Sequence, residues 1–253
     1  MIPGADVADV RVPRALRRWA GDRELRPVWR NEAGGLTFEV VGVGAFVKWA
    51  PAGSRLRIAE EARRLAWAGR HLRVPAVLGS GRDEDGTWLV TSALPGRSAV
   101  DPRWLARPEV AVRVLGEGLR LLHESLPVAG CPFEWSVAGR VERARAGAVA
   151  DGRADLLQRV AEFPGPPPHD RLVVCHGDPC CPNTLIGDDG ELAGHVDLDC
   201  LGVADRWADL AVGSWSLEWN YGPGWDGAYF AAYGVEPDAE RIAYHRALWS
   251  LGD

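Results

Sequence analysis

The chain has 253 residues, enough to bury a substantial core in one domain or in two closely joined lobes. Its formal net charge of −6 argues against a nucleic-acid-binding protein, which normally concentrates basic side chains on one face. No apolar run reaches the roughly 18 residues of a membrane span, and residues 1–12 lack the apolar core of a signal peptide. We therefore expect a cytoplasmic protein that binds neither nucleic acid nor membrane.

The first 50 residues predict a short helix and then antiparallel strands. Residues 14–19 form an arginine-rich helix candidate that we expect to be peripheral. Residues 28–30 and 36–41 are typical of strands, joined by a turn at Gly34 and Gly35. Gly-Gly is an ordinary hairpin turn, but two glycines also allow backbone amides to approach phosphate groups closely, and the pair alone does not decide between these roles.

Lys48 is the only lysine in the chain, although arginine is common. It lies in the β-branched and aromatic strand candidate 45–49, at a site that would accept a compact ammonium and not a planar guanidinium. Glu61 follows 13 residues later (61 − 48) at the start of a helix-like segment. In kinases a strand lysine contacts the α and β phosphates, and a helix glutamate positions it. Glu60 is an alternative partner, and an exposed place on the helix surface is the alternative for Glu61.

Residues 76–81 and 87–91 predict two more strands around a turn at 83–86. The amino-terminal part is therefore expected to be a small, mostly antiparallel sheet with one helix. We place the boundary with the next lobe at Pro95 and Gly96. The lobes would then span residues 1–94 and 95–253.

Apolar residues recur at intervals of three and four in residues 108–125, which predicts an amphipathic core helix. His123 lies near its end and is better explained as a packed or capping side chain than as a ligand. Further helices are expected over 137–150 and 154–163. The proline-rich segment 164–168 must be a loop, because proline lacks the amide donor that a helix needs.

The most informative stretch follows the apolar run 172–174. Asp178 and Asn183 are five positions apart (183 − 178), the spacing of a phosphoryl-transfer loop in which the aspartate orients a hydroxyl and the asparagine holds Mg²⁺. A hairpin that turns at 187–190 then returns Asp197 to the same place as a second metal-binding carboxylate. Asp and Asn in such loops often only bind the local backbone. The downstream Asp197 favours the catalytic interpretation.

Segment 174–183, the pair Val196 and Asp197, and segment 201–211 together resemble the aminoglycoside 3'-phosphotransferase family. The resemblance implies an α+β, two-lobed, protein-kinase-like fold with a nucleotide-binding amino-terminal lobe and a larger, mostly helical catalytic lobe. It also implies transfer of the γ-phosphate of ATP, or sometimes GTP, to a hydroxyl of an antibiotic. The expected cofactor is Mg²⁺, and the expected partner is a small-molecule hydroxyl acceptor, bound by a monomer or homodimer.

The resemblance assigns roles residue by residue. Asp178 would be the catalytic residue, and Asn183 and Asp197 would hold the metal. Phe46 would stack on the base, whose edge would bind the backbone near Ser92 and Leu94. The remaining nucleotide contacts would come from Lys48, Glu61, Gly34, Gly35 and Thr37.

The sequence also suggests roles for three residues that follow Asp197. Asp199 stands where relatives commonly have glycine, so it would either bind a second Mg²⁺ or face solvent. Asp209 resembles a buried aspartate that holds the catalytic loop by accepting backbone hydrogen bonds. Arg206 is expected to be an ion-pair partner.

The acceptor site is the least readable part, because residues 150–170 carry few acids. The later part is rich in aromatic residues that could stack on a sugar or a flat ring, or could equally be core: Trp215, Trp219, Tyr221 and Trp225. The candidate substrate residues are Glu218, Trp219, Asp226 and the terminal Asp253.

Two other functions stay open. One is the same chemistry on a metabolic alcohol or sugar, and the other is a nucleotide-binding regulator without turnover. Protein-kinase activity is disfavoured, because no activation-segment signature follows Asp197.

The cysteines are an odd number in a chain without an export signal, which favours reduced thiols: Cys131, Cys175, Cys180, Cys181 and Cys200. No C-x-x-C pair occurs, and the adjacent Cys180 and Cys181 cannot easily direct both sulfurs to one metal ion. A zinc site is therefore disfavoured.

Overall fold

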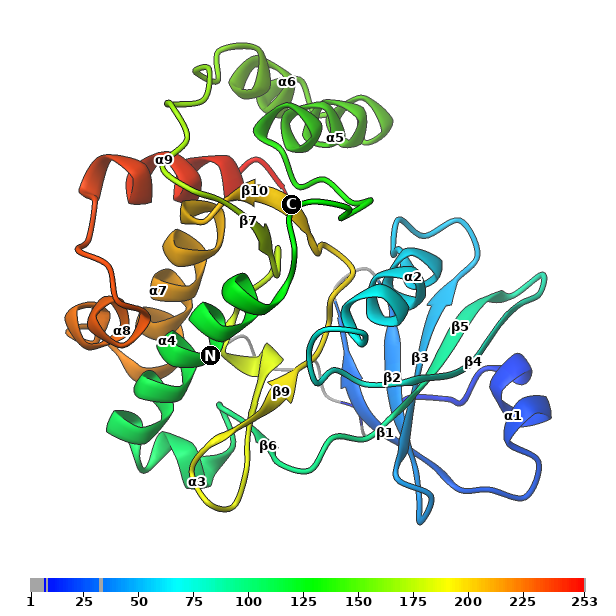
Figure 1. Ribbon diagram of the computed structural model, residues 1–253. Helices are drawn as coiled ribbons and strands as arrows, with labels where there is room; N and C mark the ends of the chain where they lie inside the picture. The colour runs from blue at the N-terminus through cyan, green and yellow to red at the C-terminus, as the bar shows by residue number, and fades with distance from the viewer. Residues whose placement is uncertain (1–6, 8, 32–33, 253) are drawn as a thin grey trace. The chain divides into compact units, whose positions relative to one another are not determined.

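The computed structural model describes residues 7, 9–31 and 34–252 (Figure 1). It divides into two compact units, Met1–Pro95 and Gly96–Asp253. Each unit is described by itself below.

The first unit is built on one antiparallel sheet of five strands, in the spatial order β1-β2-β3-β5-β4. Two helices accompany the sheet, α1 (Arg14–Ala20) and α2 (Ile58–Ala68). The strands are β1 (Leu25–Arg30), β2 (Leu36–Val40), β3 (Ala45–Pro51), β4 (Val77–Arg82) and β5 (Gly86–Ser92). The strands predicted from the sequence are all present, with ends that differ by a few residues.

Helix α1 is part of the core, so the expectation that it is peripheral was wrong. Leu16 is completely buried in a cluster with Phe38 and Val40 of β2 and Val47 of β3. Alternate residues of these strands point to the same face of the sheet. The arginines of α1 lie around this one buried stripe, and they hide it from a reading of composition alone.

The second unit contains most of the helices. They are α3 (Pro102–Leu105), α4 (Pro108–Ser125), α5 (Val137–Ala150), α6 (Ala154–Ala161), α7 (Trp207–Tyr221), α8 (Asp226–Tyr233) and α9 (Ala239–Trp249). The strands are short and form two small sheets, β10-β7 and β6-β8-β9. Their bounds are β6 (Arg97–Ser98), β7 (Leu172–Cys175), β8 (Thr184–Ile186), β9 (Leu192–His195) and β10 (Gly202–Asp205), with a 3₁₀ turn η1 (Cys181–Asn183) before β8.

Helices α4, α7 and α8 enclose the main core of this unit (Figure 1). Helices α4 and α5 have the bounds that the sequence predicted. Helix α6 ends at Ala161, two residues early. The reason is that Phe163 precedes Pro164, and the proline ring disfavours a helical conformation in the residue before it.

Helix α7 was not anticipated. Ten of the eleven positions from Trp207 to Leu217 are buried, so the helix has no long polar face there. Periodicity identifies a helix by its contrast between faces, and a helix buried on most sides offers little contrast.

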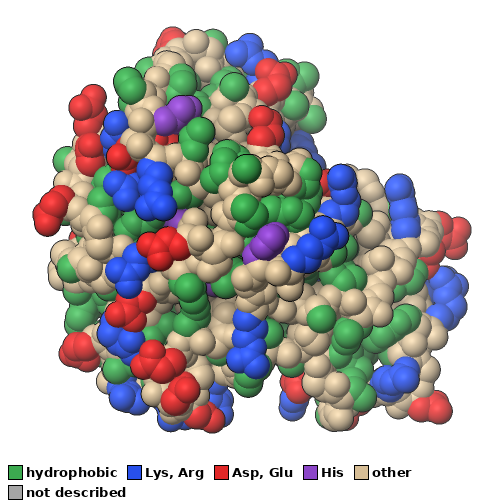
Figure 2. Space-filling model, in the orientation of Figure 1, with side chains coloured by type: hydrophobic (Ala, Val, Ile, Leu, Met, Phe, Trp, Pro, Cys, Tyr) green, Lys and Arg blue, Asp and Glu red, His purple; other side chains and the backbone are tan. Residues whose placement is uncertain are grey.

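Charged side chains of both signs are interspersed on the face of the second unit shown in Figure 2. None of the helices formed by the described residues is both long enough and apolar enough to cross a lipid bilayer.

Candidate active site

Asp178 lies in the loop between β7 and η1, where its side chain is half-buried and its Oδ1 is shielded from water. Burial, with the negative charge of Asp197 adding to it, raises the pKa of Asp178. Within the described part of the chain, no group donates a hydrogen bond to its buried Oδ1. An unsatisfied buried carboxylate oxygen is costly, and such groups in native proteins usually have a functional explanation. This oxygen can accept a proton from a bound molecule, or a hydrogen bond from its hydroxyl group.

Asn183 closes the loop. Its side-chain Nδ2 donates to the backbone oxygen of Asp178 at 3.0 Å, so the amide Oδ1 is not needed for that contact. The Val196 amide donates to the Asn183 backbone oxygen at 3.0 Å, which ties the loop to the segment that carries Asp197. Asp197 has φ +65°, the one positive φ of a non-glycine residue in the ranges that the structure describes. Such conformations cost energy and concentrate at functional sites.

The carboxylates of Asp178, Asp197 and Asp199 influence one another. The charges of Asp197 and Asp199 both raise the pKa of Asp178. Gathered carboxylates repel, and a divalent cation relieves the repulsion while accepting carboxylate and amide oxygens as ligands. The residues that the sequence nominated for Mg²⁺ therefore fit that ion.

Asp209 holds the catalytic loop from the first turn of α7. Its Oδ2 accepts from the His176 amide at 2.6 Å, and its Oδ1 accepts from the Gly177 amide at 3.0 Å. Gly177 has φ +88°, and a Cβ there would collide with the carbonyl of Cys200, so only glycine fits. The predicted structural role of Asp209 is confirmed.

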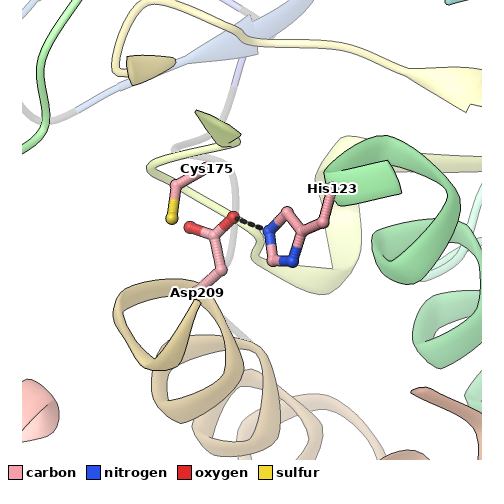
Figure 3. A group of neighbouring side chains, drawn as sticks. All are labelled: His123, Cys175 and Asp209. Carbon is pink, nitrogen blue, oxygen red and sulfur yellow. Dashed lines mark hydrogen bonds and ion pairs between the residues drawn. The ribbon is translucent and has the colours of Figure 1, made fainter. Parts of the chain in front are cut away.

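His123 completes this arrangement (Figure 3). Its Nε2 lies 2.9 Å from Asp209 Oδ2, and its Nδ1 lies 2.8 Å from the Tyr233 hydroxyl. Burial by itself would raise the pKa of Asp209, but the His123 hydrogen bond, the charges of His123 and His176 and the Gly177 amide together lower it. The prediction that His123 is a packed side chain is confirmed.

His123, Cys175 and Asp209 come close enough to suggest a metal site (Figure 3). Their partners argue otherwise, because both ring nitrogens of His123 and both oxygens of Asp209 are already engaged. The Cys175 thiol donates to the Asp205 carbonyl, and burial raises its pKa well above the usual range. A metal needs a thiolate, so the cluster is a hydrogen-bonded support for the loop.

Sequence analysis missed the support beneath Asp178. Cys180 lies close to Asp178: burial raises the pKa of the Cys180 thiol well above its usual range, and the charge of Asp178 adds to this. Ser216 Oγ of α7 accepts from the Cys181 amide at 2.9 Å and from Asn220 Nδ2 at 3.2 Å. Only the fold brings α7 to this loop. Cys180, one of the two cysteines inside the loop, was the sole hint. All five cysteines are free thiols.

Lys48 and Glu61 form an ion pair inside the first unit. Lys48 Nζ lies 2.6 Å from Glu61 Oε1, and Glu61 is only 3 % exposed. Glu60 pairs instead with Arg63 and Arg64. The structure thus decides between the two glutamates and excludes an exposed surface position for Glu61.

The other nucleotide candidates of this unit share strand faces and turns. Thr37 of β2 pairs in register with Lys48, so both point to the same face of the sheet. Phe46 lies two residues before Lys48 on that face and is half-buried. Ser92 is already bound within the sheet, because its amide donates to the Ala76 carbonyl at 2.9 Å. Leu94 follows the end of β5 and is half-buried.

The glycine turn is held by Asn31. The Gly34 amide donates to the Asn31 carbonyl at 3.1 Å, and the Gly35 amide donates to Asn31 Oδ1 at 2.7 Å. Gly34 has φ +81°, which favours glycine. A Cβ on Gly35 would lie 2.5 Å from Leu56 Cδ1 and 2.8 Å from Asn31 Nδ2. The backbone of the turn therefore favours glycine at position 34, whereas at position 35 a Cβ would require the Leu56 and Asn31 side chains to shift.

The aromatic segment divides between two roles. Tyr221 and Trp225 pack against the main core, and the Tyr221 hydroxyl donates to the Ala99 carbonyl. Trp215 and Trp219 instead contact each other, with ring centres 5.0 Å apart and a 43° tilt. Both are half-buried on α7. The sequence could not separate these pairs.

The acidic candidates for acceptor binding differ in availability. Glu218 is paired with Arg246 at 3.1 Å, and Arg246 also lies 5.5 Å from the Trp215 ring centre. Asp226 begins α8, and burial raises its pKa. Asp253 lies outside the described residues.

Comparisons with known proteins place the chain in a family. The model of the APH phosphotransferase enzyme family matches residues 14–245. An aminoglycoside 3'-phosphotransferase of Streptomyces fradiae is 33 % identical, with 92 % of this chain and 97 % of that protein covered. A streptomycin 3''-kinase of Streptomyces griseus is 32 % identical, with 87 % and 89 % covered.

Solved structures agree. The crystal structure of an aminoglycoside-3'-phosphotransferase of type VIII has a TM-score of 0.79 and 34 % identity, with 94 % of this chain and 97 % of that chain covered. An aminoglycoside phosphotransferase of Streptomyces rimosus, in complex with ADP and streptomycin, has a TM-score of 0.73 and 28 % identity, with 93 % and 95 % covered. These likenesses confirm the predicted kinase-like α+β fold. The chain belongs to the APH phosphotransferase enzyme family, and the resemblance drawn from its catalytic motif is confirmed.

Proposed function

We propose that this protein transfers the γ-phosphate of ATP or GTP to a hydroxyl of an aminoglycoside-type antibiotic. The observation that carries the proposal is the Asp178 carboxylate with its buried Oδ1. It shares a loop with Asn183, and it lies near enough to Asp197 for the charge of Asp197 to raise its pKa. Family membership supports the reaction class. The relatives that act on aminoglycosides, and the relative bound to ADP and streptomycin, support the two substrates.

Asp178 would act on the acceptor. Its Oδ1 would accept the hydrogen of the acceptor hydroxyl and aim the oxygen at the γ-phosphate, while Asn183 holds the backbone of the aspartate. Its raised pKa makes it a better proton acceptor than an exposed aspartate. Phosphoryl transfer depends mainly on such positioning and on neutralised charge.

Lys48 would bind the nucleotide phosphates. Its ammonium is already aimed by the buried Glu61, so little side-chain freedom would be lost on binding. The Gly34 and Gly35 turn, Thr37, Phe46 and the backbone at Ser92 and Leu94 are proposed as the further nucleotide contacts.

Asn183 Oδ1 and the Asp197 carboxylate would hold Mg²⁺. When bound, the ion neutralises charge on the phosphate oxygens. Asp199, whose charge also reaches Asp178, is the candidate for a further metal contact.

A second candidate acceptor is a metabolic alcohol or sugar without multiple positive charges. The ion pair of Glu218 with Arg246 favours it, because the pair removes one carboxylate from those that would attract a polycation. The contacting rings of Trp215 and Trp219 offer an apolar surface for a sugar ring.

A release assay separates these candidates. ADP production is measured with Mg²⁺ and ATP while the acceptor is varied among aminoglycosides, other basic antibiotics, and uncharged sugars and alcohols. The proposal predicts ADP release that depends on an aminoglycoside. If only the uncharged acceptors support ADP release, the second candidate replaces the proposal. If no acceptor supports ADP release, the protein binds nucleotide without turnover.

A further inference from the structure

The Gly96–Asp253 unit contains a cavity of about 250 Å³ away from the catalytic loop. It is lined by Leu172 of β7 and Asp205 of β10, which are paired at one end of the two-stranded ribbon. The opposite end of the ribbon is the pair of Cys175 and Gly202, from which β7 enters the catalytic loop. The lining contains none of the residues from His176 to Asp199. The cavity is therefore separate from the proposed catalytic residues.

The cavity runs from an exposed mouth to a buried floor. Pro166, His169 and Leu172 are exposed at the mouth. Arg140 and His245 line the interior and are 1 % and 2 % exposed. The volume equals that of about eight waters at about 30 Å³ each, and it lies just below the range of about 300–1,000 Å³ for drug-sized ligands.

One wall of the mouth is fastened in place. The Tyr244 hydroxyl of α9 donates to the Pro164 carbonyl at 3.1 Å, and Arg241 donates to the Pro168 carbonyl at 2.8 Å. These bonds anchor the proline-rich loop to α9 at both ends. A ligand would enter a largely formed site, which lowers the entropic cost of binding.

His245 offers a polar atom to this interior. Its Nδ1 is buried and has no hydrogen-bond partner among the residues that the structure describes. Burial first, and then the charges of Arg140 and Arg241, lower the pKa of His245 to about 4, so the ring is neutral. A neutral imidazole can hold its proton on Nδ1 and donate it to a ligand.

The buried floor of the cavity carries a positive charge. The Arg140 guanidinium lies 5.0 Å from the Trp135 ring centre and brings a positive charge to the floor. The Asp205 carboxylate is occupied by the amides of Asp170 and Trp207, and it lies 3.7 Å from Arg241. Glu134 accepts from the Ser136 hydroxyl at 3.1 Å. The negative groups of the lining are thus engaged with protein donors.

The rest of the lining is apolar: Trp135, Val137, Pro167, Leu172, Val203, Ala204 and Ala208. We infer that this cavity is a second ligand site, and that it takes a small organic carboxylate with a flat apolar body. The ligand carboxylate lies toward Arg140 and accepts a hydrogen bond from His245 Nδ1. The apolar body lies between Trp135 and the proline-rich loop.

Benzoate is the probe, and benzamide is its uncharged counterpart. Binding to the full chain is measured by titration calorimetry and ligand-observed NMR, with and without saturating ADP. We expect saturable one-to-one binding of benzoate with a dissociation constant on the order of 1 mM, as for other fragments. Benzamide should bind about tenfold more weakly, and ADP should not displace benzoate.

Two variants locate the site. Leu172→Trp, an exposed position at the mouth, should abolish benzoate binding by obstruction. His245→Phe keeps a planar aromatic ring but removes the Nδ1 donor. It should weaken binding about three- to tenfold, the cost of one hydrogen bond. Leu121→Trp is the matched control, because Leu121 is an exposed leucine of α4 outside the cavity.

Several results would overturn the inference. They are no saturable binding to the wild type, equal binding of benzamide, displacement by ADP, or undiminished binding to folded Leu172→Trp. The binding assay needs no turnover, so a failure of the proposed phosphotransferase activity would leave this inference standing, and the reverse also holds.

Discussion

Asp178 combines two features that a merely structural aspartate would not need, an unsatisfied buried oxygen and a raised pKa. We predict that Asp178→Ala lowers turnover by at least about 10²- to 10⁴-fold, the contribution of a positioned base. The nucleotide affinity should change little, since Asp178 is proposed to contact the acceptor. Steady-state kinetics and nucleotide titration measure the two quantities separately.

The control for this variant is Asp188→Ala. Asp188 is an exposed carboxylate in the turn of the β8–β9 hairpin and pairs with Arg103. Its removal should leave turnover unchanged. Normal turnover in Asp178→Ala would remove the mechanism.

Lys48 and Glu61 should affect the nucleotide instead. Lys48→Met removes the ammonium, and we expect the KM for ATP to rise at least about tenfold, because a charge-assisted contact to phosphate is lost. Glu60→Gln is the matched control to Glu61→Gln, since Glu60 is only half-buried and contacts only arginines in the ion pairs described above. Equal kinetic effects of the two glutamine variants would contradict the assigned pairing.

Single residues were predictable where the chemistry demands one residue type at one spacing. The contacts of Asp209 and the pairing of Lys48 with Glu61 belong to this class, and the roles of Asp178 and Asn183 stay predictions. The support from Ser216 does not belong to this class, because its hydroxyl and the Cys181 amide that it binds are 35 residues apart (216 − 181) and only tertiary packing brings them together.

At the scale of elements, the contact between α4 and α8 depends on one glycine. A Cβ on Gly116 would lie 2.6 Å from the Tyr229 carbonyl oxygen and 2.7 Å from Ala232 Cβ. We predict that Gly116→Ala destabilises the protein by about 1–3 kcal/mol, because backbone of α8 must move. Urea denaturation of the wild type and the variant measures the difference.

Gly118→Ala is the matched control on the same helix. Its Cβ would meet the end of the Leu192 side chain at 3.0 Å, which can rotate away. Alanine also gains about 1 kcal/mol of helix propensity over glycine. A loss for Gly118→Ala as large as for Gly116→Ala would contradict the packing argument.

Elements were predictable when one face differed from the other. The helix α4 has a clear apolar stripe, and its bounds were correct. Helix α7 has little contrast between faces, and the buried place of α1 depends on the single Leu16 among arginines. The periodicity of apolar residues could predict neither of them, because the burial of these helices is set by the elements that pack against them.

At the scale of the whole molecule, stability should fall in mild acid. His245 has an unfolded-state pKa of 6.5 and a folded-state pKa of about 4. Below pH 6.5 the unfolded chain binds a proton that the folded chain excludes, so stability falls until about pH 4. This one group accounts for a loss of about 3 kcal/mol over that interval.

His245→Phe isolates this effect. Chemical denaturation of both proteins at pH 7 and pH 4.5 should show a smaller acid loss for the variant. A parallel loss in both proteins would show that other groups cause the acid sensitivity.

The reaction class was predictable from one segment, whereas the acceptor was not. The described candidates for acceptor recognition lie on α7 and α8, where Glu218 is paired with Arg246. Such pairs join distant positions and leave no local pattern.

The most direct test follows phosphorus itself. ³¹P NMR of the wild-type protein with Mg²⁺, ATP and an aminoglycoside should show loss of the γ-phosphate signal and growth of a phosphomonoester on the antibiotic, with neither change in Asp178→Ala. Conversion of the γ-phosphate to inorganic phosphate alone, or an unchanged spectrum with the wild type, would contradict the account.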